Sequence, residues 1–93
     1  MTLELDLSIS KVSQVKLLDR GRVIDQLTGS NTLELIDQIL VKNNLKLADL
    51  DGVESFPGPG SYTGLKVGAA IANALNFALG KKSRVRPIFE AKT

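Results

Sequence analysis

The sequence predicts one α/β domain with the element order β-β-β-α-β-α-β and a mixed five-stranded sheet. Apolar and polar residues alternate over Leu3–Ile9, which is the period of a half-buried strand. Two later segments repeat apolar residues at helical spacing. The 93 residues, 43% hydrophobic and 24% charged, have the size and composition of one globular domain, so residues 1–93 are taken as a single unit.

Three strands come first. Leu3–Ile9 is followed by Val12–Leu18 and Val23–Leu27, and Asp19–Arg22 forms the turn between the last two. Gly21 suits that turn because glycine tolerates positive φ. We expect an antiparallel meander.

The first helix is predicted to begin at Asn31, since Glu34 three residues later completes a capping-box pattern. It should end near Asn43–Asn44. Its expected buried face is Leu33, Ile36, Ile39 and Leu40.

The second half continues with a turn at Leu47–Asp51 and a strand at Val53–Phe56. A second helix is expected over Thr63–Leu79, with Gly80 ending it. The last expected strand is Arg84–Phe89, at a sheet edge because Pro87 has no N–H.

The expected strand order is 3-2-1-4-5. Right-handed crossovers place both helices on one face of that sheet. Glu4, Asp6 and Glu54 interrupt the apolar pattern of their strands. We therefore expect the other face to be polar and uncovered.

The second helix is apolar around nearly its whole circumference, with Lys66, Asn73 and Asn76 as its only polar stripe. Such a helix favours burial on more than one side. A partner protein is one way to bury it, and the first helix with nearby loops is another.

The composition excludes several kinds of catalytic site. The chain has no Cys and no His, so it contains no thiolate nucleophile and no Ser-His-Asp or Cys-His arrangement. Net charge is +4 from Lys81 onward and −2 before it. The basic tract suits either RNA phosphates or a solvated strand. We see no membrane span and no signal peptide at Met1–Glu4.

The most specific segment is GPGSYTGLKVG at residues 58–68. It resembles the "GPGS(F/Y)TGLR(I/V)G" signature of the TsaB (YeaZ) family. The likeness covers the N-terminal half of a usual member and implies an actin-like (ribonuclease-H-like) half-domain. The signature loop comprises Gly58, Pro59, Gly60, Ser61, Tyr62, Thr63, Gly64 and Gly68.

The resemblance implies a non-catalytic cytoplasmic scaffold in tRNA threonylcarbamoyladenosine modification. Family members pair with TsaD or with themselves, and a TsaE ATPase joins; direct tRNA contact stays open. The two helices would carry these contacts. The candidate partner-interface residues are Leu35, Ile39, Lys66, Ala69, Ala70, Asn73, Ala74 and Phe77.

Two departures from the family pattern are visible: Asp6–Ser10 replaces an Asp-Thr-Ser/Ala-Thr run, and Ser30–Thr32 stands where a His is frequent. Alternatives are a stand-alone homodimer of different purpose and, less favoured, a nucleotide- or metal-dependent enzyme.

Gly58-x-Gly60-x-x-x-Gly64 approaches a dinucleotide fingerprint, but no acidic residue follows at the ribose-binding distance. The Ser8–Val12 hairpin also has no glycine. We expect no catalytic residue, cofactor or metal. The loop should be architectural, with Ser61 or Thr63 as helix cap and with Gly68 in a close helix contact.

Overall fold

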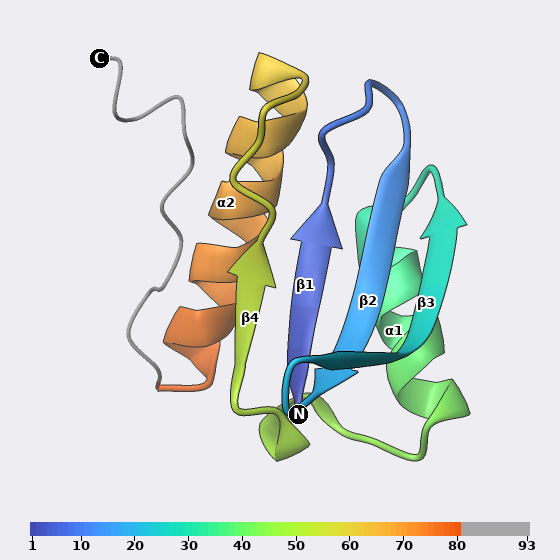
Figure 1. Cartoon of the computed structure of the whole chain (residues 1–93). Coiled ribbons are helices and arrows are strands. Elements are labelled where there is room, and N and C mark those ends of the chain that lie inside the picture. The colour runs from blue at the N-terminus through green and yellow to red at the C-terminus, as the bar shows by residue number, and fades with distance from the viewer. Residues whose placement is uncertain (81–93) are drawn as a thin grey trace.

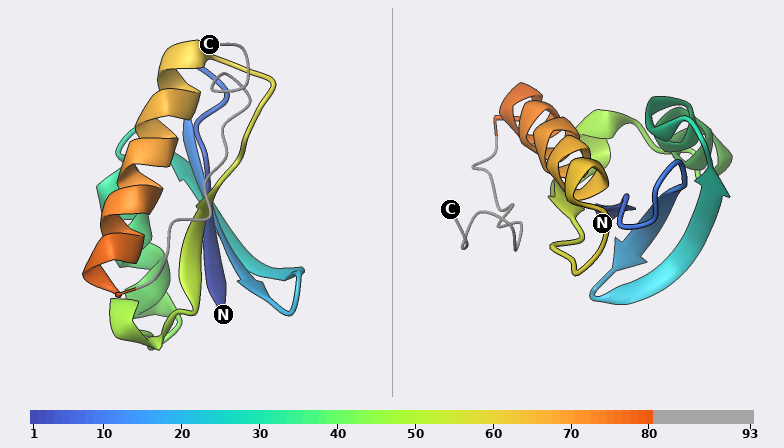
Figure 2. Two further views of the ribbon diagram at one scale, coloured as in Figure 1. Left: turned by 90° about the vertical axis from the view of Figure 1, so that its left-hand side faces the viewer. Right: turned by 90° about the horizontal axis from the view of Figure 1, so that it is seen from above.

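The computed structural model describes residues 1–80, which form a mixed sheet with two helices on one face (Figures 1 and 2). The strands are β1 (Thr2–Asp6), β2 (Ser13–Asp19), β3 (Arg22–Gly29) and β4 (Gly52–Ser55). The helices are α1 (Thr32–Lys42) and α2 (Tyr62–Ala78), with a short 3-10 turn at Leu47–Asp49.

The strand order is β3-β2-β1-β4, with β1 antiparallel to β2 and parallel to β4. This confirms the predicted order of the first four strands and the placement of both helices on one side. The described residues form four strands rather than the five predicted, since Arg84–Phe89 and the basic tract lie outside them.

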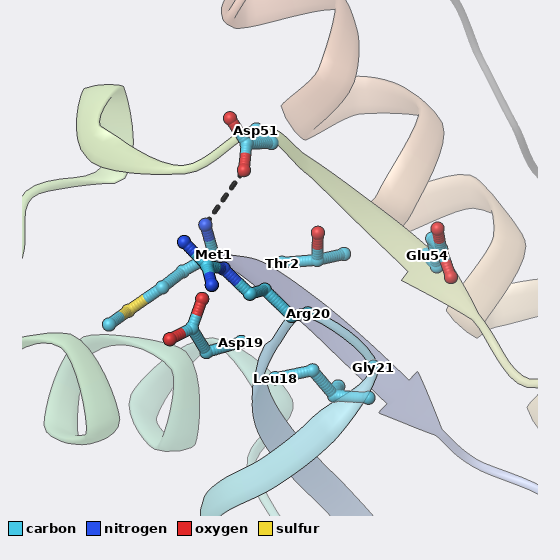
Figure 3. A pocket seen from close by; sticks show the side chains of 8 residues that line it. All are labelled: Met1, Thr2, Leu18, Asp19, Arg20, Gly21, Asp51 and Glu54. Atoms are coloured by element: carbon cyan, nitrogen blue, oxygen red, sulfur yellow. Dashed lines mark hydrogen bonds and ion pairs between the residues drawn. The ribbon is translucent and has the colours of Figure 1, made fainter.

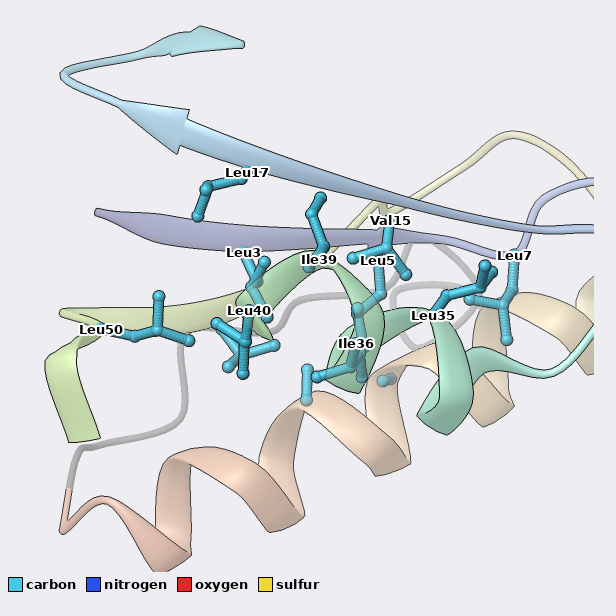
Figure 4. Close-up of a cluster of buried hydrophobic side chains, with 13 residues drawn as sticks. Leu3, Leu5, Leu7, Val15, Leu17, Leu35, Ile36, Ile39, Leu40 and Leu50 are labelled. Carbon is cyan, nitrogen blue, oxygen red and sulfur yellow. The ribbon is translucent and has the colours of Figure 1, made fainter. Parts of the chain in front are cut away.

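The core lies between the sheet and the helices (Figure 4). Leu3, Leu5, Val15 and Leu17 alternate along β1 and β2 and are fully buried against this layer. The intervening residues point to the opposite face. There Glu4 is half-buried and pairs with Lys16 at 3.8 Å. Among the described residues, the predicted polar face is therefore present.

Helix α1 buries Ile36, Ile39 and Leu40 as predicted, but not Leu33. Leu33 is 61% exposed, while Leu35 is buried in the core. The hydroxyl of Thr32 explains this, because it lies in the buried layer and shares a 2.6 Å hydrogen bond with the hydroxyl of Ser13. The buried face of α1 thus begins with a paired polar residue, Thr32, and leaves Leu33 exposed.

The junction between β4 and α2 is held against the end of β1. The Ser61 N–H donates to the Ser8 carbonyl at 2.6 Å. A Cβ added at Gly64 would overlap the carbonyl oxygen of Leu7, and one at Gly60 would lie 2.6 Å from the Ser8 oxygen. Backbone therefore packs directly on backbone here, where no side chain fits.

The helix contact at Gly68 is less close than predicted. A Cβ at Gly68 would lie 3.1 Å from the Ser55 hydroxyl oxygen, which can rotate away. Gly64, and not Gly68, is the tightest position of α2.

Ser61 is the N-cap of α2, because its Oγ accepts the Gly64 N–H at 3.3 Å. Thr63 lies inside the first turn and is exposed. The prediction left the cap open between these two residues, and the structure selects Ser61. The predicted cap of α1 is confirmed, since Asn31 accepts from the Glu34 N–H at 3.1 Å.

The C-terminal end of α1 is hydrogen-bonded to β3 through one carboxylate, that of Asp25. Asp25 accepts from Asn43 Nδ2 at 3.0 Å and from Lys42 Nζ at 3.2 Å. The hydrogen bond from Asn43, followed by the one from Lys42, lowers the pKa of Asp25 below its ordinary value of 3.8. The ionised form therefore favours the folded state.

Replacing Gly64 by alanine should destabilise the chain by about 1–3 kcal/mol or more, because β1 and α2 must separate to admit the methyl group. Gly68→Ala is the matched control on the same helix. It should be near neutral, since better helix propensity offsets a small shift of Ser55. Urea unfolding of both variants measures the difference; equal losses would contradict this account of the junction.

The Asp25 contacts predict a pH effect with a definite sign. A carboxylate whose folded pKa is lowered contributes stability above its unfolded value and loses it as pH falls through the folded value. Thermal melts from pH 7 to about pH 2.5 should therefore show wild type losing its advantage over Asp25→Asn once the pH drops below about 3.8. Asp37→Asn, on the exposed side of α1, is the control. A constant difference across the range would contradict the assignment.

Candidate functional site

The outward side of α2 exposes apolar and small side chains along one stripe. We call Lys66, Val67, Ala70, Asn73, Ala74 and Phe77 the outer helix face; all six are exposed. They recur at three- and four-residue spacing and so form one stripe. Phe77 is 85% exposed and Val67 is 44% exposed. Lys66 is the only charged residue of α2.

Five of the eight predicted interface residues belong to this stripe: Lys66, Ala70, Asn73, Ala74 and Phe77. The other three do not. Leu35, Ile39 and Ala69 are 7%, 0% and 5% exposed and pack in the chain's own core. They cannot contact a partner unless that core opens, so we remove them from the candidate interface. Val67 is exposed on the same stripe and was not among the predicted residues.

The predicted polar stripe of α2 is only partly exposed. Asn73 is exposed, whereas Asn76 is only 1% exposed and lies on the sheet side of the helix. Its amide Nδ2 and Oδ1 bond the backbone of Val53 at 2.7 and 2.8 Å. Periodicity alone does not reveal such a residue, because a buried amide and a solvated one look alike in sequence.

The signature loop joins β4 to α2 beside a hollow of about 350 Å³. Hydroxyl residues are prominent among those lining it, including Ser30, Thr32, Ser61 and Thr63, and both helices begin there. Two N–H groups of the loop, and that of Leu65 in the first turn of α2, are already bonded within the chain. Those of Ser61, Gly64 and Leu65 donate to Ser8 or Ser61 oxygens at 2.6 to 3.3 Å. These three donors are not available to a phosphate.

A second hollow, of about 650 Å³, lies at the opposite end of β1 (Figure 3). The amino group of Met1 donates to Asp51 there at 2.7 Å. Asp19, Arg20 and Glu54 also line it, so it mixes charges of both signs. Within residues 1–80 no group of three or more His, Cys, Asp or Glu side chains is placed to hold a metal ion.

The described residues thus offer two different kinds of surface. The hollow at Met1 is open and mostly polar, whereas the hollow beside the signature loop is lined by apolar and hydroxyl side chains and includes Val67 of the outer helix face. Part of the polar lining of both hollows already bonds within the chain. The outer helix face is apolar and has small side chains at its centre. The arrangement is suited to protein contact. No helix in the described part of the chain is long and apolar enough to cross a bilayer.

Comparison with known proteins connects these features to a family. A family model described as "TsaD: tRNA N6-adenosine threonylcarbamoyltransferase" matches residues 27–85. Two curated proteins bearing that enzyme name, from Bartonella tribocorum and Ralstonia pickettii, are each 38% identical to this chain over 65 residues. Each alignment covers 66% of this chain, but only 18% and 19% of the relative.

Solved structures give a longer match. YeaZ from Pseudomonas aeruginosa superposes with a TM-score of 0.73 and 26% identity, over 86% of this chain and 41% of that one. A second structure, described as an uncharacterized protein with similarity to peptidase YEAZ from Pseudomonas aeruginosa, has a TM-score of 0.76 and 24% identity over 91% of this chain and 42% of that one. The chain thus spans about two fifths of these structures, whose fold it shares. Because the family model matches more than half of its residues, the chain belongs to the TsaD family, and within it resembles YeaZ (TsaB).

Proposed function

We propose that this chain is a TsaB-like, non-catalytic partner-binding protein that serves tRNA threonylcarbamoyladenosine modification in the cytoplasm. The observation that carries the proposal is the outer helix face, with its exposed Phe77 and Val67. Similarity to YeaZ and to proteins named as threonylcarbamoyltransferases supports the process. The exposed apolar side chains of the outer helix face support the binding role.

The shape of the face suits another helix. Ala70 and Ala74 lie one turn apart at its centre, where their small side chains allow a second backbone to come close. Phe77 and Val67 flank them and supply larger apolar groups. Full burial of an exposed Phe or Val side chain contributes roughly 1.5–3 kcal/mol. A contact centred on the alanines would gain this term without deforming the fold.

The charges on α1 and α2 suggest which partner surface would contact the outer helix face. The outer helix face carries Lys66 and no acidic residue, whereas α1 exposes Glu34 and Asp37 on the same side of the sheet. A second copy related by a two-fold axis would bring α1 of one chain toward α2 of the other and pair these charges. A TsaD-like protein with a comparable acidic helix would fit equally well, and a TsaE-like ATPase would join that complex.

Two other functions remain as alternatives. A stand-alone homodimer of different purpose would use the same face but would not bind a TsaD-like protein. A nucleotide-dependent enzyme would instead use the hollow beside the signature loop. The internal bonds of Ser61, Gly64 and Leu65 weigh against the second alternative.

The chain should self-associate at micromolar concentration with a mass of about twice 10.0 kDa. Ala74→Glu should weaken this association at least about tenfold, because it buries an unpaired charge in the contact. Analytical ultracentrifugation of wild type and variant measures both quantities. Gln26→Glu, which adds the same charge at an exposed site on β3, is the control and should associate like wild type.

A pull-down with the TsaD-like protein of the same organism then separates the first proposal from the stand-alone dimer. We expect wild type and Gln26→Glu to retain that protein and Ala74→Glu to lose it. A strictly monomeric wild type that also fails to bind a TsaD-like protein would end the partner-binding proposal.

ATP with magnesium should bind with a Kd above about 100 µM, a binding free energy weaker than about −5.5 kcal/mol, since the loop N–H groups of Ser61 and Gly64 already bond within the chain. Isothermal titration calorimetry checks this directly. A micromolar site that is lost in Ser61→Ala would instead favour the nucleotide-dependent alternative.

A further inference from the structure

The apolar side chains of the outer helix face have the same order in both directions along α2. Its two larger apolar residues, Val67 and Phe77, stand at the ends, and Ala70 and Ala74 lie between them. Val67 and Phe77 are each five residues from Ala72, and the two alanines are each two residues from it. A stripe with this large-small-small-large order matches a second copy that is turned end for end.

The positions around the helix axis have the same symmetry. At about 100° per residue, Val67 and Phe77 lie on opposite sides of the stripe's midline. That midline is opposite Ala72, which is 0% exposed and faces the sheet. A two-fold axis through the midline reverses both the height and the side of each residue, so it places Phe77 of one copy on Val67 of the other. It likewise places Ala70 against Ala74 of the second copy.

A hollow lies where the ring of the second copy arrives. The hollow of about 350 Å³ beside the signature loop is lined by Val67 and also by Ile9 and Val12, from the turn between β1 and β2. All three are exposed in a single copy. The start of α2 and this turn lie at the same end of the sheet (Figure 1). The expected strand order puts Arg84–Phe89 at the β4 edge, whereas the hollow lies on the side of β1 and β2.

We propose that two copies of the chain pack α2 against α2 in antiparallel orientation, and that Phe77 of each copy fills the hollow beside the signature loop of the other. The occupant is a second copy because one surface carries both the exposed ring and the recess that receives it. One two-fold operation fills both hollows, so the assembly closes at two copies. The inference rests on the proposed function, since it specifies how the outer helix face contacts a second copy.

The first test uses wild-type protein. In a sample that mixes isotope-labelled and unlabelled copies, NMR should detect intermolecular contacts from the Phe77 ring protons to the methyl groups of Val67, Ile9 and Val12. Contacts between the Phe77 rings of the two copies would show a parallel pair and would overturn the proposal. A ring that contacts only residues of its own chain, including residues 81–93, would overturn it too.

The second test uses thiol cross-linking, because the chain has no Cys of its own. Positions 67 and 77 are about 15 Å apart on one helix, which is too far for a link within a chain. A short bifunctional thiol reagent should therefore convert Val67→Cys/Phe77→Cys to covalent dimers. Phe77→Cys alone and Val67→Cys alone are the controls and should not cross-link, since each places its two thiols at opposite ends of the contact. Cross-linking of Phe77→Cys alone would overturn the antiparallel orientation.

Failure of this inference can be distinguished from failure of the proposed function. A wild-type dimer in which Phe77 does not contact Val67 of the second copy overturns the inference and leaves partner binding standing. A wild type that is strictly monomeric also overturns the inference. Retention of the TsaD-like protein in the pull-down then decides whether the partner-binding proposal survives.

Discussion

The contact that the rest of the structure depends on is the direct packing of the signature-loop backbone on the end of β1. Ser61 donates to Ser8, and no side chain fits at Gly64 against the Leu7 carbonyl. This contact fixes where α2 begins. Since a helix is rigid, the starting point and the inward side of α2 determine where every later residue of the helix lies. The second fixed point is Asn76, whose two bonds to Val53 hold the far half of α2 on β4.

These two attachments decide which side of α2 faces outward. With Gly64, Gly68, Ala72 and Asn76 directed toward the sheet, Ala70, Asn73, Ala74 and Phe77 must point away from it. The glycine-rich segment thus acts at a distance, by presenting a binding surface. A similar sequence in a phosphate-binding protein would leave its N–H groups open to the ligand. In this chain three of those groups are bonded internally, which is why we assign the segment to architecture.

Much of the fold could be predicted from the sequence, because it depends on local patterns. The Asn31 cap was predicted correctly, and Gly21 and Gly80 have positive φ. The alternation over Leu3–Ile9 located β1, but the strand ends at Asp6 and Ile9 is 66% exposed. The errors occurred where a tertiary polar contact overrides periodicity. Thr32 lies inward because Ser13 meets it, which turns Leu33 outward. Asn76 was taken for a surface residue because its partner, the Val53 backbone, has no signal in the sequence. The candidate interface included Ile39, although helical periodicity had already placed that residue on the buried face, and Leu35 and Ala69, whose burial the assembled core reveals.

The central claim is that the chain acts through the outer helix face while the signature loop only builds it. Amide chemical shifts followed by NMR test both halves at once, first in a dilution series and then with ATP and magnesium added. The account predicts concentration-dependent shifts at Ala70, Asn73, Ala74 and Phe77, and constant positions for Gly58 and Gly60 in both series. Shifts confined to the loop on adding ATP, with an outer helix face that does not respond to concentration, would contradict it.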